Sequence, residues 1–176
     1  AEVTDVSNAV YEEADALMVS GETSVGKYPV RCIEILDRVS RRIERSGGLG
    51  FAKDARLETE KQHAVQAACQ MADSIPEAVL VVFTSTGKTA IQTALLRPRA
   101  PIYAFTKDCR ALQFLSLARG VRPFFVEFED NPRMTIANAI DILRRHRDIP
   151  TGTPLVVVSD TLQGTRPVNT ILVEHA

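Results

Sequence analysis

Hydrophobic and polar residues follow one another along this chain in the pattern of an α/β protein. The clearest case is the stretch from Val79 to Leu96, where an unbroken apolar run over 79–83 precedes the polar segment TSTGKT. A continuous apolar run is typical of a parallel strand with both faces buried. After the polar segment, Ile91, Ala94 and Leu95 recur at the i, i+3 and i+4 spacing of an amphipathic helix. The pattern therefore predicts a buried strand, a short polar turn and a helix.

The same alternation continues on both sides of this stretch. Further strands are predicted over 101–105, 121–128, 154–159 and 170–174, and helices over 58–74, around Leu112, Leu115 and Ala118, and over 134–145. Strands that alternate with helices of this length favour a parallel sheet covered on both faces. The segment between the last two strands is too short for a helix, so we expect them to pair antiparallel. The predicted fold is α/β: a three-layer α/β/α domain with a five-stranded, mostly parallel mixed sheet.

Two helix ends and one helix face can be predicted in this part of the chain. Thr106 or Asp108 is placed to cap one helix, and Asn131 followed by Pro132 is a typical start of another. The helix over 58–74 is expected to bury one apolar stripe: Val65, Ala68, Cys69 and Ala72.

The N-terminal part of the chain has helical and extended patterns of its own. Apolar residues share one helical face near the start: Val3, Val6, Ala9 and Val10. An apolar run over 16–19 predicts a short buried strand, and Pro29 suits the first turn of a helix over 30–43. We expect this helix to turn the following residues inward: Cys32, Ile33, Ile35, Leu36 and Val39. The segment RSGGLG then predicts a flexible boundary, with domains over 1–46 and 51–176.

Composition and charge exclude several classes of partner. The chain is 45% hydrophobic and 24% charged, as in ordinary soluble globular proteins. Its net charge of -1 argues against binding to nucleic acid or to an anionic membrane surface, which both favour clustered positive charge. No apolar run approaches the length of a membrane span, and no secretory signal opens the chain. We expect a cytoplasmic protein with no nucleic-acid or membrane partner.

Cysteine and histidine positions predict neither disulfides nor a metal site. Cys32, Cys69 and Cys109 are odd in number and far apart in sequence, so we expect reduced and mostly buried thiols. Histidines are equally scattered, at His63 and at positions 146 and 175, and no pair has the spacing of a zinc motif on one helical face. We predict no metal ligands.

The polar turn is the best candidate for a binding site. A strand, a short hydroxyl-rich loop and a helix start direct free backbone N–H groups and the positive end of a helix dipole at one point, which suits an anion. The candidate phosphate-binding residues are Thr84, Ser85, Thr86, Gly87, Lys88 and Thr89. A Walker A loop would need glycine where this chain has Val82, so the turn is not of that type. The alternative, that Thr84 to Thr86 only cap the helix, stays open.

Several motifs resemble the pyruvate kinase family. The N-terminal segment contains A-E-x-x-D-V-x-N-A-V, D-A-x-M-x-S-G-E-T and G-x-Y-P at the family's spacing, and the later part contains FTSTGKTA, RPRAPIYAFT and ARGVRP. The resemblance covers the whole chain. It implies that 1–46 is a remnant of the catalytic (β/α)8 barrel, its last β/α unit, and that 51–176 is the C-terminal allosteric and oligomerisation domain. One departure is Val25, where many members carry a lysine.

The resemblance also implies an activity for the complete enzyme. Pyruvate kinase transfers the phosphoryl group of phosphoenolpyruvate to ADP in the last step of glycolysis, with Mg²⁺ and K⁺ as cofactors. The residues for this chemistry lie on earlier barrel strands, so we expect this chain alone to be inactive and to hold no ligands for either ion. Ser20, Glu22 and Thr23 would line the nucleotide side of the barrel, unless Gly21 and Glu22 only shape the turn.

Regulation is the function that the resemblance implies for the C-terminal part. Residues 84–89 would bind a phosphorylated effector: a sugar bisphosphate, a sugar monophosphate or a nucleotide monophosphate. Arg166, in a loop predicted over 161–169, and Arg133 are candidates for further contacts, although both can be surface arginines. The family is usually a homotetramer. A stand-alone phosphometabolite-binding module without catalytic activity is the alternative, and an initial alanine fits a fragment of the complete enzyme.

Overall fold

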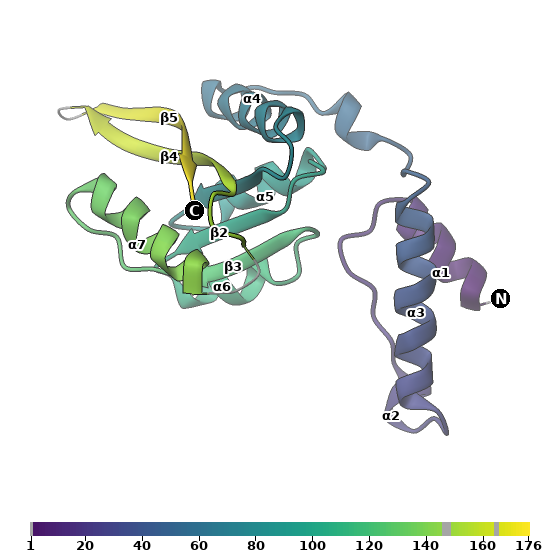
Figure 1. Cartoon of the computed structure of the whole chain (residues 1–176). Coiled ribbons are helices and arrows are strands. Elements are labelled where there is room, and N and C mark those ends of the chain that lie inside the picture. Colours follow the sequence, from purple (N-terminus) through teal and green to yellow (C-terminus); the bar gives the residue numbers. More distant parts are fainter. Residues whose placement is uncertain (1, 146–148, 164–165) are drawn as a thin grey trace. The chain divides into compact units, whose positions relative to one another are not determined.

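The chain forms two compact units. The computed structural model describes residues 2–145, 149–163 and 166–176, and over 160–163 and 166–168 it describes the backbone alone. The units are Ala1–Ala55 and Arg56–Ala176, so the division falls shortly after the glycine-rich segment. Figure 1 shows the helices and strands of each unit.

The N-terminal unit is a small helical assembly. Its elements are α1 (Glu2–Tyr11), α2 (Gly21–Ser24), α3 (Pro29–Glu44) and the 3-10 turn η1 (Phe51–Asp54). Pro29 lies in the first turn of α3, as predicted, where its missing N–H costs no hydrogen bond. None of the residues of α1, α2 or α3 is fully buried. This unit therefore has no closed hydrophobic core among its described residues.

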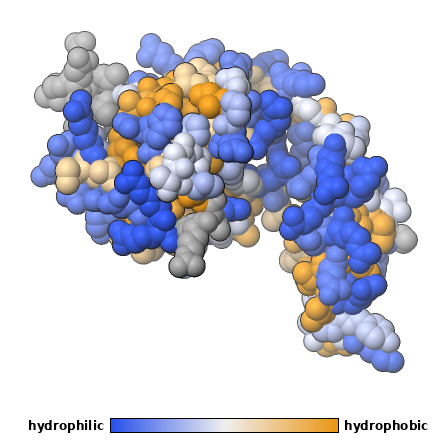
Figure 2. Space-filling view, in the orientation of Figure 1, coloured by the Kyte–Doolittle hydropathy of each residue, from blue (hydrophilic) through white to orange (hydrophobic). Residues whose placement is uncertain are grey.

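Two expectations for this unit are wrong. Residues 16–19, predicted as a buried strand, are not a strand, and Met18 is 88% exposed. A parallel strand needs hydrogen-bonding neighbours, and the described part of this unit contains no other strand. Ile33 and Ile35 of α3 were expected to point inward but are 47% and 37% exposed. Figure 2 shows the resulting hydrophobic side chains on the surface of this unit.

The C-terminal unit is built on the predicted five-stranded mixed sheet. Its strands are β1 (Val79–Phe83), β2 (Ile102–Thr106), β3 (Val121–Phe125), β4 (Pro154–Gln163) and β5 (Arg166–His175). The order is β3-β2-β1-β4-β5. All neighbouring pairs are parallel except β4 and β5, which pair antiparallel. β1 is therefore the central strand, and all five of its residues are buried.

Helices cover both faces of this sheet, which confirms the three-layer prediction. They are α4 (Glu60–Ser74), α5 (Lys88–Leu95), α6 (Cys109–Leu115) and α7 (Pro132–Arg145). One hydrophobic cluster packs residues of α4, α5 and α6 against alternate residues of β1, such as Leu80 and Val82. The other packs α7 against the remaining residues of β1, such as Val81 and Phe83. The predicted stripe of α4 is buried as expected.

The C-terminal hairpin and one helix face differ from the predictions. Residues 161–163 and 166–169, predicted as parts of a loop, continue the two strands, and the pairing runs from Asp160↔Asn169 to Gln163↔Arg166. Along these residues the backbone N–H and C=O groups of one strand pair with those of the other, so the hairpin in Figure 1 is long. In α5, Leu95 is 57% exposed rather than buried. Thr93 takes an inward position because its hydroxyl donates to the carbonyl oxygen of Thr89 at 2.8 Å.

Candidate anion-binding site

The candidate loop follows β1, the strand at which the strand order of the sheet reverses. From β1 the chain crosses to β2 on one side, whereas β4 lies on the other side of β1. Connections that diverge from a central strand leave a crevice at the carboxyl ends of the strands, where α/β proteins bind ligands. Residues 84–87 begin at this edge of the sheet.

Gly87 forms the helix start that closes the loop. It is the N-cap of α5 and has a φ of 85°, in the left-handed region that favours glycine. The first hydrogen bond of the helix joins the N–H of Ile91 to the carbonyl oxygen of Gly87 at 3.0 Å. The N–H groups of Lys88, Thr89 and Ala90 precede this bond, so they have no partner further back in the helix. They are the donors that a helix N-terminus offers to an anion.

A cavity of about 360 Å³ opens beside this loop. Its lining consists of Lys61, Phe83, Thr84, Ser85, Thr86, Lys88, Thr89, Gln92 and Phe128. The structure thus brings five of the six candidate loop residues around one cavity, and the sixth, Gly87, forms the cap. Ser85, Thr86 and Lys88 are exposed, while Thr84 and Thr89 are buried. Gly87 is buried as well, so half of the loop is open to solvent.

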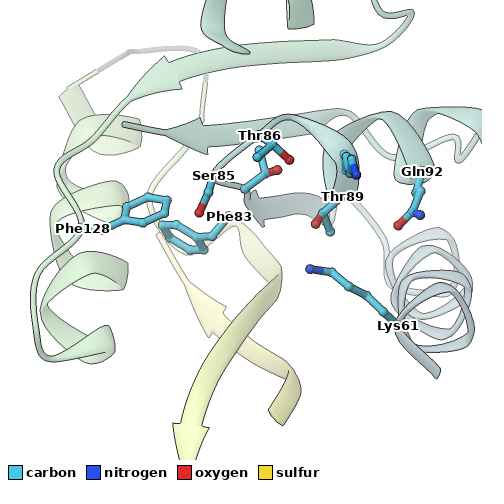
Figure 3. Close-up of a pocket in the computed structure, with 9 residues that line it drawn as sticks. Lys61, Phe83, Ser85, Thr86, Thr89, Gln92 and Phe128 are labelled. Atoms are coloured by element: carbon cyan, nitrogen blue, oxygen red, sulfur yellow. The ribbon is translucent and has the colours of Figure 1, made fainter. Parts of the chain in front are cut away.

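Two polar residues of this cavity were missed in the sequence. Lys61, in the first turn of α4, directs its ammonium group toward the loop, and Gln92 lies on α5 (Figure 3). The start of α4 has a recognisable signal, because Thr59 and Gln62 form a capping box. No local pattern tells which loop the first turn of that helix will face, since this depends on the packing of α4 on the sheet.

Arg133 lies in a different hollow. It lines a cavity of about 510 Å³ with Pro132, Ile136, Ser159, Thr170, Leu172 and Glu174. A narrow hollow of about 100 Å³ shares Pro132, Ile136 and Ser159 with that cavity, and shares Phe83 and Phe128 with the loop cavity. The side chain of Arg166 lies outside the described residues, and its backbone belongs to β5 rather than to a loop.

The candidate residues of the N-terminal unit form bonds within their own turn. The N–H of Ser20 donates to a carboxylate oxygen of Glu22 at 3.1 Å, and the Thr23 hydroxyl donates to the carbonyl oxygen of Ser20, also at 3.1 Å. These contacts are those expected of residues that shape the turn before α3. Val25, the departure from the family pattern, is 89% exposed.

Sequence comparison decides the family. Residues 62–174 match the family described as "Pyruvate kinase, alpha/beta domain", and residues 1–33 match "Pyruvate kinase, barrel domain". The chain belongs to the pyruvate kinase family. The resemblance seen in the motifs is thereby confirmed.

Individual pyruvate kinases align with most of this chain. Plastidial pyruvate kinase 3, chloroplastic, of Arabidopsis thaliana is 35% identical over 172 residues, which cover 96% of this chain and 29% of that protein. Pyruvate kinase 2 of Synechocystis sp. is 32% identical over 164 residues, covering 93% and 28%. The pyruvate kinase of Thermotoga maritima is 34% identical over 129 residues, covering 72% and 27%. The chain thus spans under a third of the length of these pyruvate kinases.

Among the described residues of this pyruvate kinase family member, no cysteine lines the loop cavity. Among the described residues, no group of three or more His, Cys, Asp and Glu side chains is placed to hold a metal ion. Cys69 is buried, but Cys32 is half-buried and Cys109 is exposed, so the expectation of mostly buried thiols is wrong. In the same part of the chain, no helix combines the length and apolar character needed to cross a bilayer.

Proposed function

We propose that this chain is the C-terminal part of a pyruvate kinase and that residues 84–89 bind a phosphorylated effector. The observation that carries the proposal is the cavity beside the helix start at Gly87, which hydroxyl groups and two lysines line. The parent enzyme would transfer the phosphoryl group of phosphoenolpyruvate to ADP as a transferase of glycolysis. The effector would be a sugar phosphate or a nucleotide monophosphate.

The chemistry of the lining suits a phosphate monoester. Hydroxyl groups and backbone N–H groups each donate one hydrogen bond, and Lys88 and Lys61 supply positive charge against the phosphate. A hydrogen bond to a charged group contributes about 1.5 to 3 kcal/mol. A dissociation constant of about 1 μM corresponds to roughly 8 kcal/mol, so about four bonds at the upper end of this range reach it against ordering costs of about 4 kcal/mol.

The catalytic step itself is proposed to lie outside this chain. Phosphoryl transfer depends on metal ions and cationic groups around the moving phosphate. Among the described residues no group of three or more His, Cys, Asp and Glu side chains is placed to hold a metal ion. We propose that Mg²⁺ and K⁺ bind elsewhere in the complete enzyme. The turn would then border the nucleotide side of the barrel in the complete enzyme. Ser20, Glu22 and Thr23 would act indirectly, because their hydrogen bonds stabilise this turn.

Effector binding would regulate the enzyme through its subunit arrangement. We propose a homotetramer in which the C-terminal units contact one another. A ligand can activate such an assembly only by binding one arrangement more tightly, typically by about 1 to 3 kcal/mol. A cytoplasmic location remains our expectation, although the Arabidopsis relative is a chloroplastic protein by its name.

Thermal unfolding with and without ligand tests the binding proposal. A ligand that binds the folded state raises the melting temperature, so inorganic phosphate and sugar phosphates are expected to stabilise the chain. Lys88→Ala is expected to abolish most of this stabilisation. Lys53→Ala, at an exposed lysine of the other unit, is the control and should leave it unchanged. Equal stabilisation of all three proteins would contradict the assignment of the site.

A further inference from the structure

The helix α4 is fixed to the rest of its unit along its middle and at its end, but less so at its start. Its buried residues lie between Val65 and Ala72, so the first turn contributes none to the core. At the other end, the Asp73 carboxylate accepts hydrogen bonds from the N–H groups of Arg99 at 2.8 Å and Ala100 at 3.0 Å. Helix ends that bury no side chain in a core open locally. The first turn is therefore the part of α4 that opens most easily.

A capping box ties this first turn to the segment that precedes it. The Gln62 side chain accepts hydrogen bonds from the N–H groups of Glu58 at 2.7 Å and Thr59 at 2.9 Å. The C-terminal unit begins at Arg56, so only residues 56–59 separate its boundary from the helix. When the first turn opens, Gln62 moves away from these two N–H groups. Opening of the helix start therefore also releases the segment that joins the two units.

Lys61 connects the first turn of α4 to the loop cavity. It lines this cavity together with Lys88 and Thr89 of α5, and Figure 3 shows its ammonium group directed at the loop. Lys61 and the loop belong to different elements, so an anion bound by both of them joins the two. The charge-assisted bond to Lys61 forms only while the first turn of α4 is folded. Phosphate therefore binds the closed helix start more tightly than the open one.

We propose that phosphate bound at residues 84–89 acts through Lys61 to close the first turn of α4 and to order residues 56–59. This inference rests on the proposed binding of phosphate at that loop. Coupling between two events is reciprocal, so the factor by which the closed turn raises phosphate affinity is also the factor by which phosphate suppresses opening. A charge-assisted hydrogen bond is worth about tenfold in affinity, so saturating phosphate should reduce opening about tenfold.

Hydrogen exchange of the whole 176-residue chain tests the inference. The exchange of the amides over 62–64 is followed by NMR with and without saturating inorganic phosphate, and we expect it to slow about tenfold. The start of α3, in the other unit, is the matched control. There the N–H of Cys32 donates to the carbonyl oxygen of Tyr28 at 3.1 Å, and exchange over 32–34 should be unchanged.

Three variants of the first turn sharpen this test. Lys61→Ala is compared with the wild type at equal saturation, which calorimetric dissociation constants define for each protein, and its exchange over 62–64 should not respond to phosphate. Lys61→Arg keeps a cationic donor and should retain most of the response. His63→Ala changes an exposed residue of the same turn that does not line the cavity, and it should respond as the wild type does.

Limited proteolysis reports on the segment 56–59 itself. Trypsin cleaves after the exposed Arg56, and cleavage follows the population of the open form when opening and closing are fast. Saturating phosphate should slow this cleavage about fivefold in the wild type and leave it unchanged in Lys61→Ala. Cleavage after the exposed Arg45, at the end of α3, is the internal control and should keep its rate.

The outcomes separate this inference from the proposed function. If calorimetry detects no phosphate binding to the wild type, the phosphate site is wrong and the inference falls with it. If phosphate binds but either exchange over 62–64 or cleavage after Arg56 keeps its rate, the inference alone is overturned. The same holds if Lys61→Ala responds like the wild type at equal saturation, or if the amides over 32–34 slow by the same factor.

Discussion

The N–H of Thr84 donates a hydrogen bond of 3.0 Å to the carbonyl oxygen of Phe105, one strand away. The first residue after β1 is therefore still tied to the sheet, and the free part of the loop begins at Ser85. At its other end the loop is fixed by Gly87, whose carbonyl oxygen accepts the first hydrogen bond of α5. A turn fixed at both ends binds an anion with little further loss of conformational entropy.

We expect Gly87→Ala to destabilise the protein and to weaken phosphate binding. A residue with a side chain costs about 1 to 2 kcal/mol in the left-handed region, and Gly87 has a φ of 85°. The added Cβ would lie 3.6 Å from a carbon of Leu115, an ordinary contact, so the cost comes from the backbone. Urea unfolding measures the stability, and titration with inorganic phosphate measures the binding.

Gly120→Ala is the matched control for that experiment. Gly120 has a φ of 75°, and an added Cβ would meet no atom within 4 Å. We expect a similar loss in the free energy of unfolding but an unchanged phosphate affinity, because this glycine is not part of the loop. Equal losses of phosphate affinity in the two variants would show that the geometry at Gly87 has no special role in binding.

Lys61 is expected to strengthen phosphate binding. Its ammonium group faces the loop from the first turn of α4, and one charge-assisted hydrogen bond contributes about 1.5 kcal/mol or more. Lys61→Ala should therefore weaken binding of inorganic phosphate about tenfold. Lys61→Arg keeps the charge and should restore most of the affinity. If the alanine variant binds phosphate as tightly as the wild type, α4 takes no part in the site.

The central elements of the C-terminal unit could be predicted because their signals are local. The apolar run of β1 and the stripe of α4 depend on burial that a few neighbouring residues already specify, and Asp108 accepts the predicted capping bond from the N–H of Arg110. The loop at 84–89 follows directly from the strand and the helix on either side of it. Sequence reasoning was therefore sufficient to place the candidate loop, which is contiguous in the chain.

The failed predictions concern features set by distant residues. An apolar run such as 16–19 becomes a strand only when other strands pair with it, and the described N-terminal unit offers none. The hairpin over β4 and β5 extends because its two strands pair with each other, which a search for local strand signals cannot detect. Lys61 reaches the cavity through the packing of α4, and Phe128 through the irregular segment after β3.

The three thiols are expected to differ in reactivity. Burial and the nearby Asp73 carboxylate raise the pKa of the Cys69 thiol from 9.0 to about 12, and Cys69 is 6% exposed. The thiolate is the reactive form, so Cys69 should not react with a disulfide reagent at pH 8 in the folded protein. Exposed Cys109 should react first and half-buried Cys32 more slowly. Rapid reaction of all three thiols without denaturant would contradict this order.

The raised pKa of Cys69 also predicts a loss of stability at alkaline pH. A thiol with a higher pKa in the folded state binds its proton more tightly there, so its contribution is complete below pH 9. Between pH 9 and about 12 the unfolded thiol ionises first, and the free energy of unfolding falls. Because other groups also titrate in this range, wild type should be compared with Cys69→Ala. The decrease should be steeper in the wild type, and parallel curves would exclude this role.

The capping box at the start of α4 is expected to support both stability and binding. The Thr59 hydroxyl accepts a hydrogen bond from the N–H of Gln62 at 3.3 Å, and the Gln62 side chain accepts one from the N–H of Thr59 at 2.9 Å. Thr59→Ala should cost about 1 kcal/mol in the free energy of unfolding, whereas Thr59→Asn keeps a capping oxygen and should cost much less. Since Lys61 lies in this same turn, fraying of the helix start should also weaken phosphate binding, but by less than Lys61→Ala does. Hydrogen exchange of the amides over 60–64 measures the fraying. Unchanged exchange in Thr59→Ala would show that the capping box does not hold the helix start in place for phosphate binding.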